Sequence, residues 1–499
     1  MKQLALTLVV AVAGCSFAVA GDHEGGAGSG GGDDLSMGDA DLSTGGPDLA
    51  GTGSVDLSTG SDLAGLPIVC TAGSASCSGS TLTTCPDGTA ENMTTCALGC
   101  GTSGGAHCNQ MYPRAPITRG DFDTTGLTPV TLSANSVYIG ADTGLIGPGN
   151  APIRHANTNA ATYEVHDGVG FHLVAIAGTS VKLGIYTFKS LTVDANVVMN
   201  AYGNNGIALV SAGDLTMNGQ LDATCAGNFN LAMLFGVNHP WVQGPGGGNG
   251  GQPGVASVGF GSGGVGGVNA DNAHAAGGGG GAFADAGGSG GAQGANAGGA
   301  SGPTYGDGIL TTLVGGSGGG AGGQSGSANQ SYGGGGGGLA LMVAQGTLTI
   351  GAGNMSGGIN AGGCGGTTQM MVGGGGGGSG GTILVQALSV HLGAMGVLAA
   401  NGGGGAAGSA MPGPGTNGKP GQLGSAAAAG GQTGGGADGG NGGAGSTTAG
   451  ANGGGASGSG AGGGGSVGRV RIESQSGVAT VDTGGVVSPA AAQGTLDIH

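Results

Sequence analysis

The sequence predicts an all-β protein whose main part is a right-handed parallel β-helix, a solenoid with long glycine-rich inserts. Of its 499 residues 134 are glycine, while aromatic residues make up 3% and charged residues 7%. Average glycine usage is about 7%, so this composition excludes a large aromatic core. Short β-rich runs recur as a similar unit of two or three strands. One such unit cannot bury its apolar face alone, so neighbouring units are expected to stack.

The net charge excludes some partners. Nine Lys and Arg residues against 26 Asp and Glu residues give −17. Nucleic acids and anionic membrane surfaces need basic clusters, so neither is expected as a partner. No motif predicts a cofactor.

Residues 1–20 have the pattern of a signal peptide. A short basic start precedes the apolar run Leu4–Ala13, which is too short to span a membrane. The run ends at Val12-Ala13-Gly14-Cys15, which resembles a bacterial lipobox. The resemblance implies a diacylglyceryl lipid on Cys15 and an outer-membrane lipoprotein. Cleavage after Ala18-Val19-Ala20 is the alternative and would release a soluble secreted protein.

Two small segments follow. Residues 21–66 carry acids and no Lys or Arg, among Gly, Ser and Pro, which predicts a disordered acidic linker. Residues 67–112 contain six cysteines, which predict three disulfides whose pairing the sequence leaves open. Their spacing does not favour zinc. These cysteines are Cys70, Cys77, Cys85, Cys96, Cys100 and Cys108.

The repeat defines the rest of the chain. Residues 113–240 are expected to start the solenoid, and residues 241–499 to form its glycine-rich part with a C-terminal cap. The repeats align on Leu191, Leu215, Leu348 and Val390. The last copy is atypical, and its Arg469, Arg471 and Glu473 suit a polar cap. Cys225 and Cys364 follow the third strand of two copies, so we expect a disulfide between coils, with two free thiols as the alternative.

The glycine inserts include the hexaglycine runs Gly333–Gly338 and Gly373–Gly378. They must leave the coil as loops or pack as extended strands beside it. Glycine loses much entropy on ordering, which favours disorder. The alternative is a bundle of polyglycine-II-like helices, because glycine has no side chain to block close approach. Collagen is excluded because no strict G-X-Y period persists.

The glycine-rich pattern punctuated by Asn and Ala resembles the PGRS-like surface proteins of bacteria. It is nearest to the glycine-rich lipoproteins of myxobacteria and related deltaproteobacteria, over about residues 190–473. The cysteine-rich segment is similar to small modules that follow Asp-rich linkers in extracellular proteins of that group. The resemblance implies a cell-surface protein and carries no catalytic motif.

Three groups of residues are candidate sites. Asp194, Asp214 and Asp222 are the acids that a β-helix polysaccharide enzyme would need. Aligning the repeats places them beside Asn218, Ser190 and Val198, so they do not stack and are expected to cap turns. The cluster Glu164, His166, Asp167 and His172 has metal-type side chains but no firm third ligand, so no metal site is predicted. Thr192, Thr216 and Thr349 share one repeat position, which His391 takes in the next copy.

The predicted function is a non-catalytic structural or adhesive lipoprotein of the cell surface or envelope. It would be held at the outer membrane by its N-terminal lipid, and would contact extracellular polysaccharide or associate with itself. One alternative is a β-helix enzyme acting on polysaccharide. The other is an ice- or glycan-binding solenoid, which a flat face bearing the three threonines would favour.

Overall fold

The computed structural model describes residues 70–499, except 97, 134–135, 148–151, 226–240, 254–256, 258–263, 265, 268–274, 325–329, 354, 410–412, 414, 434–436 and 457. The predicted signal peptide, Cys15 and the acidic linker lie outside the described residues. The described part belongs to one unit, Pro67–His499. It contains no helix that is long and apolar enough to cross a membrane.

The cysteine-rich segment is a small antiparallel module, and the prediction of disulfides there is confirmed. Strands β1 (Ser74–Ser78), β2 (Thr81–Cys85) and β3 (Asn92–Thr95) form one sheet, and β4 (Cys100–Gly101) pairs with β5 (His107–Cys108). The structure selects one of the possible pairings: Cys70–Cys85, Cys77–Cys100 and Cys96–Cys108. After the module, β6 (Met111–Tyr112) pairs with the last strand, β26 (Asp497–Ile498).

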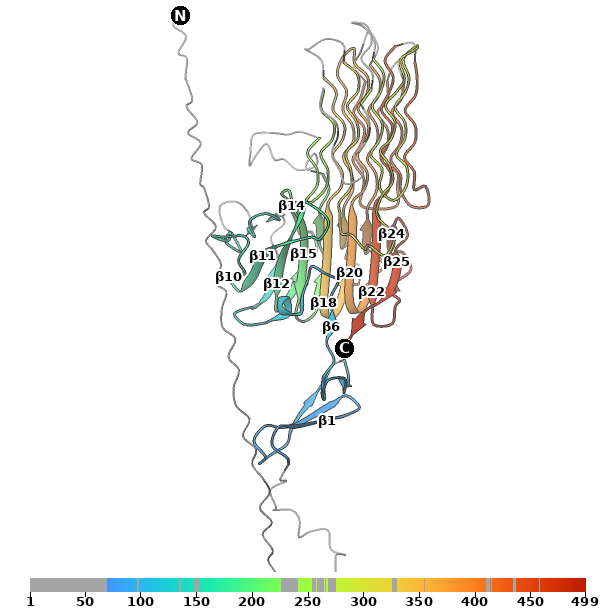
Figure 1. Ribbon diagram of the computed structural model, residues 1–499. Coiled ribbons are helices and arrows are strands. Elements are labelled where there is room, and N and C mark those ends of the chain that lie inside the picture. The colour runs from blue at the N-terminus through green and yellow to red at the C-terminus, as the bar shows by residue number, and fades with distance from the viewer. Residues whose placement is uncertain are drawn as a thin grey trace, which may run out of the picture. The chain divides into compact units, whose positions relative to one another are not determined.

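Two larger sheets form a base beside which the glycine-rich segments extend (Figure 1). The only helical element among the described residues is the 3-10 turn Arg119–Phe122. The large sheet has twelve strands and the small sheet has seven. The large sheet contains β7 (Pro129–Leu132), β10 (Glu164–His166), β11 (Val169–Ala175), β12 (Lys182–Phe188), β13 (Ser190–Val193), β15 (Gly206–Ser211), β16 (Leu215–Met217), β18 (Leu339–Ile350), β20 (Thr382–Leu392), β22 (Arg469–Ser474), β23 (Thr480–Val481) and β25 (Ala492–Thr495). The small sheet contains β8 (Ser136–Gly140), β9 (Ile146–Gly147), β14 (Val198–Tyr202), β17 (Gln220–Asp222), β19 (Gly358–Asn360), β21 (Val397–Ala399) and β24 (Val486–Ser488).

The predicted right-handed parallel β-helix is wrong. The large sheet is a curled half-barrel of mixed strands, most of them parallel. Strand β11 is antiparallel to both of its neighbours, β10 and β12, whereas β12 pairs in parallel with β15 and β15 with β18. The physical reason lies in the inserts. After β17, β19 and β21 the chain leaves the sheets for long glycine segments, so it does not wind from coil to coil as a solenoid does.

The alignment of the repeats is nevertheless confirmed strand by strand. Leu191 pairs with Leu215, Leu215 with Leu348, and Leu348 with Val390, all in parallel register. One detail differs, because Asp222 pairs with Asn200 rather than with Val198. The turn before β17 is two residues shorter than the turn before β14, which shifts the register of the small sheet.

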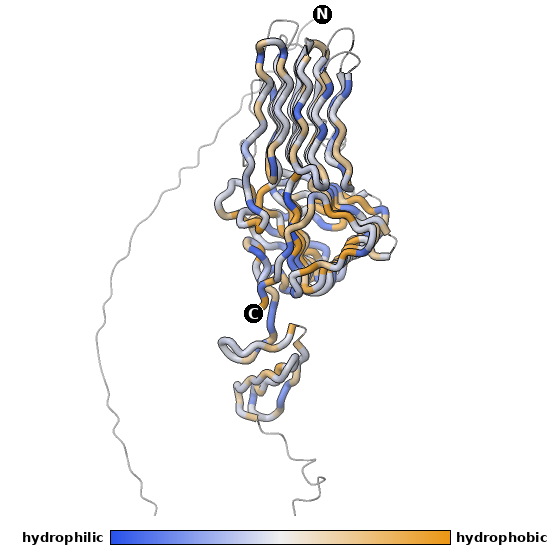
Figure 2. The backbone as a smooth tube through the Cα atoms, turned by 90° about the vertical axis from the view of Figure 1, so that its right-hand side faces the viewer, coloured by the Kyte–Doolittle hydropathy of each residue, from blue (hydrophilic) through white to orange (hydrophobic). Residues whose placement is uncertain are grey.

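The core lies on both sides of the large sheet. Leu209, Leu215 and Leu221 are fully buried in the main cluster, which the two sheets share. On the opposite side, Leu341 packs in a second cluster with Phe122 and other residues from the segments that precede β7 and follow β25. Burial on both sides explains why β15, β18 and β20 are continuous apolar runs. Figure 2 accordingly shows the hydrophobic residues gathered in the base and a paler glycine-rich part.

The described glycine-rich segments are ordered as a bundle of extended chains, the arrangement predicted as the alternative to disorder. We call this the glycine bundle. Apart from the bond from Gly247 to Gly244, the backbone hydrogen bonds of its segments run to other segments rather than within one segment. They include residues 244–251, 275–282, 287–291, 298–302, 315–323, 333–338, 361–367, 373–381, 401–408, 416–421, 428–432, 439–443, 450–455 and 460–468.

Segment 373–381 shows the geometry of the glycine bundle most fully. Its N–H groups at Gly374, Gly377 and Gly380 all donate to segment 460–468. The N–H groups of Gly375, Gly378 and Gly381 donate to segment 361–367. Those of Gly376 and Ser379 donate to segment 315–323. Its carbonyl groups accept, with the same period, from segments 275–282, 401–408 and 333–338. A period of three with no internal bond is the geometry of a threefold extended helix, so this segment is bonded to six neighbours.

Glycine is required here because the neighbouring backbones leave no space for a side chain. A Cβ atom at Gly376 would overlap the carbonyl oxygen of Gly279, and one at Gly378 would overlap that of Gly335. The close approach lets each buried N–H and C=O find a partner, which a buried backbone needs. The high glycine content that excludes a large aromatic core therefore allows the backbone segments of the glycine bundle to pack closely.

Candidate functional site

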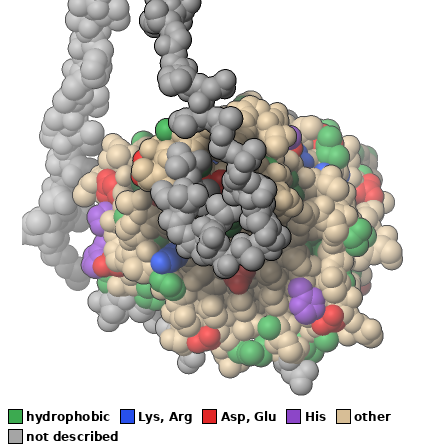
Figure 3. All heavy atoms as spheres, turned by 90° about the horizontal axis from the view of Figure 1, so that it is seen from below, with side chains coloured by type: hydrophobic (Ala, Val, Ile, Leu, Met, Phe, Trp, Pro, Cys, Tyr) green, Lys and Arg blue, Asp and Glu red, His purple; other side chains and the backbone are tan. Residues whose placement is uncertain are grey.

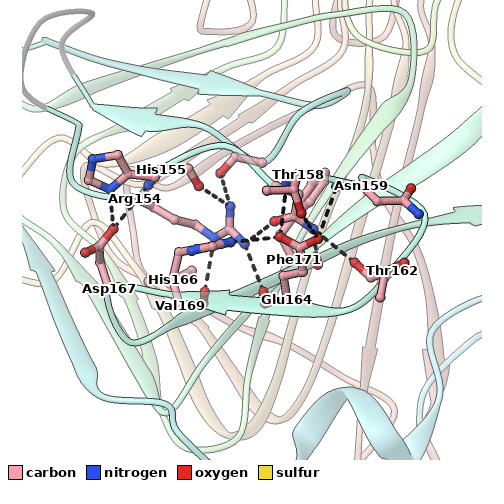
Figure 4. A network of polar contacts seen from close by, with 12 residues as sticks. Arg154, His155, Thr158, Asn159, Thr162, Glu164, His166, Asp167, Val169 and Phe171 are labelled. Atoms are coloured by element: carbon pink, nitrogen blue, oxygen red, sulfur yellow. Dashed lines mark hydrogen bonds and ion pairs between the residues drawn. The ribbon is translucent and has the colours of Figure 1, made fainter.

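The polar residues with metal-type side chains lie at the β10 edge of the large sheet, around a buried arginine (Figure 4). Arg154 is completely buried. Its Nε atom donates to the carbonyl oxygen of Val169 at 3.0 Å, and its Nη1 atom donates to those of Gly144 and His155 at 2.7 Å. Its Nη2 atom donates to Asn157 and to the carbonyl oxygen of Glu164. The guanidinium thus ties the segment before β10 to the hairpin of β10 and β11, a structural role that the sequence did not reveal.

The four residues weighed as a metal cluster do not come together. His166 Nε2 lies 2.8 Å from Glu164 Oε2, while Asp167 pairs with His155 at the same distance. His172 pairs instead with Asp121, at 2.7 Å. Among the described residues no group of three or more His, Cys, Asp or Glu side chains is placed to hold a metal ion.

These pairs favour the ionised carboxylates. The hydrogen bond from His166, followed by those from Thr158 and Asn159, lowers the pKa of Glu164 to about 2. Burial raises the pKa of Asp121, but hydrogen bonds from His172 and Thr118 outweigh it, so the pKa lies below its ordinary value. Such groups are structural anions at neutral pH rather than proton donors.

The three acids of the enzyme alternative also lie apart. Asp214 Oδ1 accepts a hydrogen bond from the backbone of Thr347 at 2.7 Å, and Asp222 Oδ1 accepts from the backbone of Thr224 at 3.1 Å. Asp194 follows β13, where its backbone N–H donates to Leu132. Asp214 precedes β16 of the large sheet, whereas Asp222 belongs to β17 of the small sheet. The carboxylate of Asp222 caps the turn after β17, as the sequence predicts for all three acids, whereas that of Asp214 bonds a residue of β18 (Leu339–Ile350). The three do not form a catalytic group in the described structure.

The threonine position of the repeat forms a longer ladder than the sequence predicts. Thr192 pairs with Thr216, Thr216 with Thr349, and Thr349 with His391. The ladder continues at both ends, to Thr131 and Thr480. We call these six residues the threonine ladder. Its end members were missed because β7 and β23 belong to degenerate copies, although the pattern of apolar, Thr, apolar was present in both.

The threonine ladder faces away from the core. Leu191 and Val193 on either side of Thr192 are buried, and Thr192 itself is partly exposed. His391 Nε2 lies 3.1 Å from Asp482 Oδ1 beside the ladder. Neighbouring strands are about 4.8 Å apart, so the ladder is a regularly spaced row of threonine side chains with one histidine, His391, among them.

The residues predicted as a polar cap are inside the base instead. Arg471 and Glu473 are buried in β22, and β25 pairs with that strand. Glu473 contacts Arg114 and Arg471, each at 2.5 Å, and Gln386 donates to it at 2.6 Å. Strands β23, β24 and β25, which follow β22 in the chain, form the end of the two sheets instead. The buried charges of β22 bond Arg114 and so hold the segment before β7 against the large sheet.

The turns where segments of the glycine bundle reverse direction far from the base form its distal end. Hydrogen bonds with neighbouring segments fix the turn between segments 361–367 and 373–381. The backbone N–H of Tyr332 donates to Thr367 Oγ1 at 2.9 Å, and the backbone N–H of Met371 donates to Ser409 Oγ at 3.1 Å. Gln369 Oε1 accepts from Gln330 at 3.0 Å. Met370 is 47% exposed. This part of the distal end thus presents uncharged polar side chains and one apolar side chain on a fixed backbone.

The charged residues do not gather on the face of the base seen from below (Figure 3). They are scattered among uncharged side chains where that face is not covered.

Comparison with known proteins gives no match. No family model fits the chain, no curated protein is similar to it, and no solved structure matches it. The resemblance to PGRS-like surface lipoproteins therefore remains a prediction.

Proposed function

We propose that the protein is a non-catalytic structural and adhesive protein of the cell surface. In this proposal the glycine bundle is a stiff scaffold that presents the turns of its distal end. The observation that carries the proposal is the bonding of segment 373–381 to six neighbours, three through its N–H groups and three through its carbonyl groups. Loops held on a rigid scaffold are the usual place for recognition in proteins.

Export and anchoring belong to the same proposal. Four disulfides join described cysteines, and such bonds persist in oxidising compartments outside the cytoplasm. We propose attachment to the outer membrane through a lipid on Cys15, with polysaccharide or a second copy of the chain as the partner.

The test combines location and adhesion. The full chain with a tag after His499 is expressed in its own cells, and intact cells are treated with protease. Surface display predicts loss of the full-length tagged species from intact cells. Protection until lysis would contradict it.

Adhesion is then measured as cohesion of cells that carry a variant of the distal end. The double change Thr368→Ala and Met370→Ala removes a partly exposed and an exposed side chain there and keeps Gln369, which bonds Gln330, so we expect cohesion to fall several-fold. The matched control is Met395→Ala with Val478→Ala, which removes exposed apolar side chains from the base. Equal cohesion of both variants and the original protein would refute presentation by the distal end.

The threonine ladder supports a second candidate, a surface that binds ice or glycan. Its regular row of hydroxyl groups is the supporting observation. The replacement Thr216→Leu places a bulky side chain in the middle of the row. If the ladder binds ice, the original protein inhibits ice recrystallisation and this variant does so markedly less. No inhibition by the original protein would remove ice as the ligand.

A further inference from the structure

Two turns near the base end of the glycine bundle border an open cavity of about 530 Å³, and most of the side chains that line it are exposed. One turn follows segment 416–421 and the other links segments 439–443 and 450–455. The volume falls within the roughly 300–1,000 Å³ of small-molecule sites. Its lining includes Ser425, Asn441, Ser446, Thr447 and Ala449.

A buried pair of polar side chains holds both walls of this cavity. Asn401 and Ser488 are fully buried, and Ser488 Oγ donates to Asn401 Oδ1 at 2.6 Å. Asn401 Nδ2 donates to the carbonyl oxygens of Gln422 at 2.9 Å and Gly424 at 2.7 Å, on the first turn. Ser488 Oγ accepts from the backbone of Gly445 at 2.8 Å, on the second turn. A satisfied buried network of this kind keeps a site in one geometry.

The lining is uncharged and offers free hydroxyl groups. The side chains of Ser425, Ser446 and Thr447 make no hydrogen bond to any described residue, although they line the cavity. Asn441 accepts a hydrogen bond from Gly430 through Oδ1, which leaves its amide N–H groups for another partner. The rest of the wall consists of alanine methyl groups and glycine backbone.

We propose that this cavity binds a neutral sugar unit of a polysaccharide. A sugar ring presents hydroxyl groups at its edge and C–H groups on its face, which match the three hydroxyl side chains and the alanine methyl groups. A uronate or a phosphorylated sugar would lose part of the hydration of its charge against this open wall without gaining an opposite charge from it, so neutral rings are favoured. This inference rests on the polysaccharide partner of the proposed function but not on presentation by the distal end, because the cavity lies near the base.

Binding is measured by calorimetry and by saturation-transfer NMR on the full, disulfide-bonded chain. The probes are neutral oligosaccharides built from glucose, galactose, mannose and N-acetylglucosamine, with oligogalacturonate as the charged comparison. We expect at least one neutral oligosaccharide to bind and oligogalacturonate to bind at least tenfold more weakly. Absence of binding by every neutral probe at millimolar concentration, or stronger binding of the charged probe, would overturn the proposal.

Variants place the binding in this cavity. Ala449→Trp fills the cavity from an exposed position and should weaken binding at least tenfold. Ala300→Trp is the matched control, because Ala300 is an exposed alanine on another outer segment of the glycine bundle. Ser446→Ala and Thr447→Val should each weaken binding several-fold without changing the melting temperature. Unchanged affinity in Ala449→Trp would place the sugar elsewhere and refute the assignment.

Discussion

Cys225 and Cys364, separated by 139 positions in the sequence, are joined by a disulfide. Cys225 follows β17 of the small sheet, and Cys364 lies in segment 361–367 of the glycine bundle. The bond therefore links the base to the glycine bundle and confirms the pairing expected from the repeat. It also closes the long loop that contains the first glycine insert.

Removal of this disulfide should destabilise the protein strongly. Closing a long loop restricts the unfolded chain, so the double change Cys225→Ser and Cys364→Ser should lower the free energy of unfolding by about 2–5 kcal/mol. Urea unfolding followed by circular dichroism measures the change. The control is Cys70→Ser with Cys85→Ser in the small module, which should leave the unfolding of the base unaltered. Equal effects of the two pairs would show that the long loop carries no special role.

The dependence of the glycine bundle on close approach can be tested at single positions. Gly376→Ala places a Cβ atom against the carbonyl oxygen of Gly279, so neighbouring segments must move apart. We expect a loss of about 1–3 kcal/mol in the free energy of unfolding, as for other overpacked sites. Gly413→Ala is the control, because a Cβ atom there meets nothing within 4 Å. A change at Gly376 as small as the change at Gly413 would disprove the packing explanation.

Arg154 should be essential for the β10 edge of the large sheet. Arg154→Met keeps much of the side-chain length but leaves the carbonyl oxygens of Gly144, Val169 and Glu164 without their donor. Unsatisfied buried acceptors cost about 1–3 kcal/mol each, so we expect a loss of at least about 3 kcal/mol. Arg119→Met, which removes an exposed contact with Tyr112, should cost less than about 1 kcal/mol. Chemical denaturation measures the free energy of unfolding of both variants. Equal losses in Arg154→Met and Arg119→Met would contradict a structural role for Arg154.

Asp222 should weaken the protein at neutral pH. Burial raises its pKa, and the hydrogen bonds from Thr224 only partly oppose this effect. A carboxyl group whose pKa is raised in the folded state is held there at a cost once it ionises. Asp222→Asn should therefore increase the free energy of unfolding at pH 7. The gain should shrink as the pH falls below the raised folded-state pKa of Asp222 and vanish below the ordinary Asp value of about 3.9. A gain that persists at low pH would contradict this explanation.

The pKa of Asp121 is shifted in the opposite direction from that of Asp222, so its replacement is the comparison. Its pKa is lowered in the folded state, so its ionised form adds stability above the ordinary Asp value of about 3.9. Asp121→Asn should destabilise the protein at pH 7. The difference from the original protein should shrink as the pH falls below about 4 and through the lowered pKa. Unfolding curves measured from pH 7 to pH 2 test both carboxylates in one series.

The register of the repeated strands in the large sheet could be predicted from the sequence, because the alternation of their side chains marks it. The register of the small sheet could not, because the turns before its strands differ in length. Leu191, Leu215 and Leu348 mark one inward position of the large sheet, and their alternation with threonine fixes which side faces the core. Thr131 and Thr480 were not predicted, because their copies keep the apolar, Thr, apolar triplet but are otherwise degenerate. The curled mixed sheet could not be predicted, because local strand patterns are the same whether or not the chain winds continuously.

The glycine bundle could be predicted only as an alternative to disorder, for a reason different from the one that hid the curled sheet. Runs such as 373–381 contain no side-chain pattern that identifies their neighbours, and each neighbour is supplied by a distant segment. The cavity near Asn401 and Ser488 is equally invisible in the sequence, because its walls meet only when three insert-derived segments are placed side by side.

The threefold repeat of bonds along segment 373–381 also limits how such a chain can change length during evolution. Adding three residues to a segment advances it by one turn and returns each N–H group to the same neighbour. Adding one or two residues turns every following N–H group toward the wrong neighbour. Segments 361–367 and 373–381 run in opposite directions, so a viable insertion must lengthen both sides of the hairpin by equal triplets. The glycine bundle can therefore grow taller or shorter in whole turns while the sheets beneath it stay unaltered.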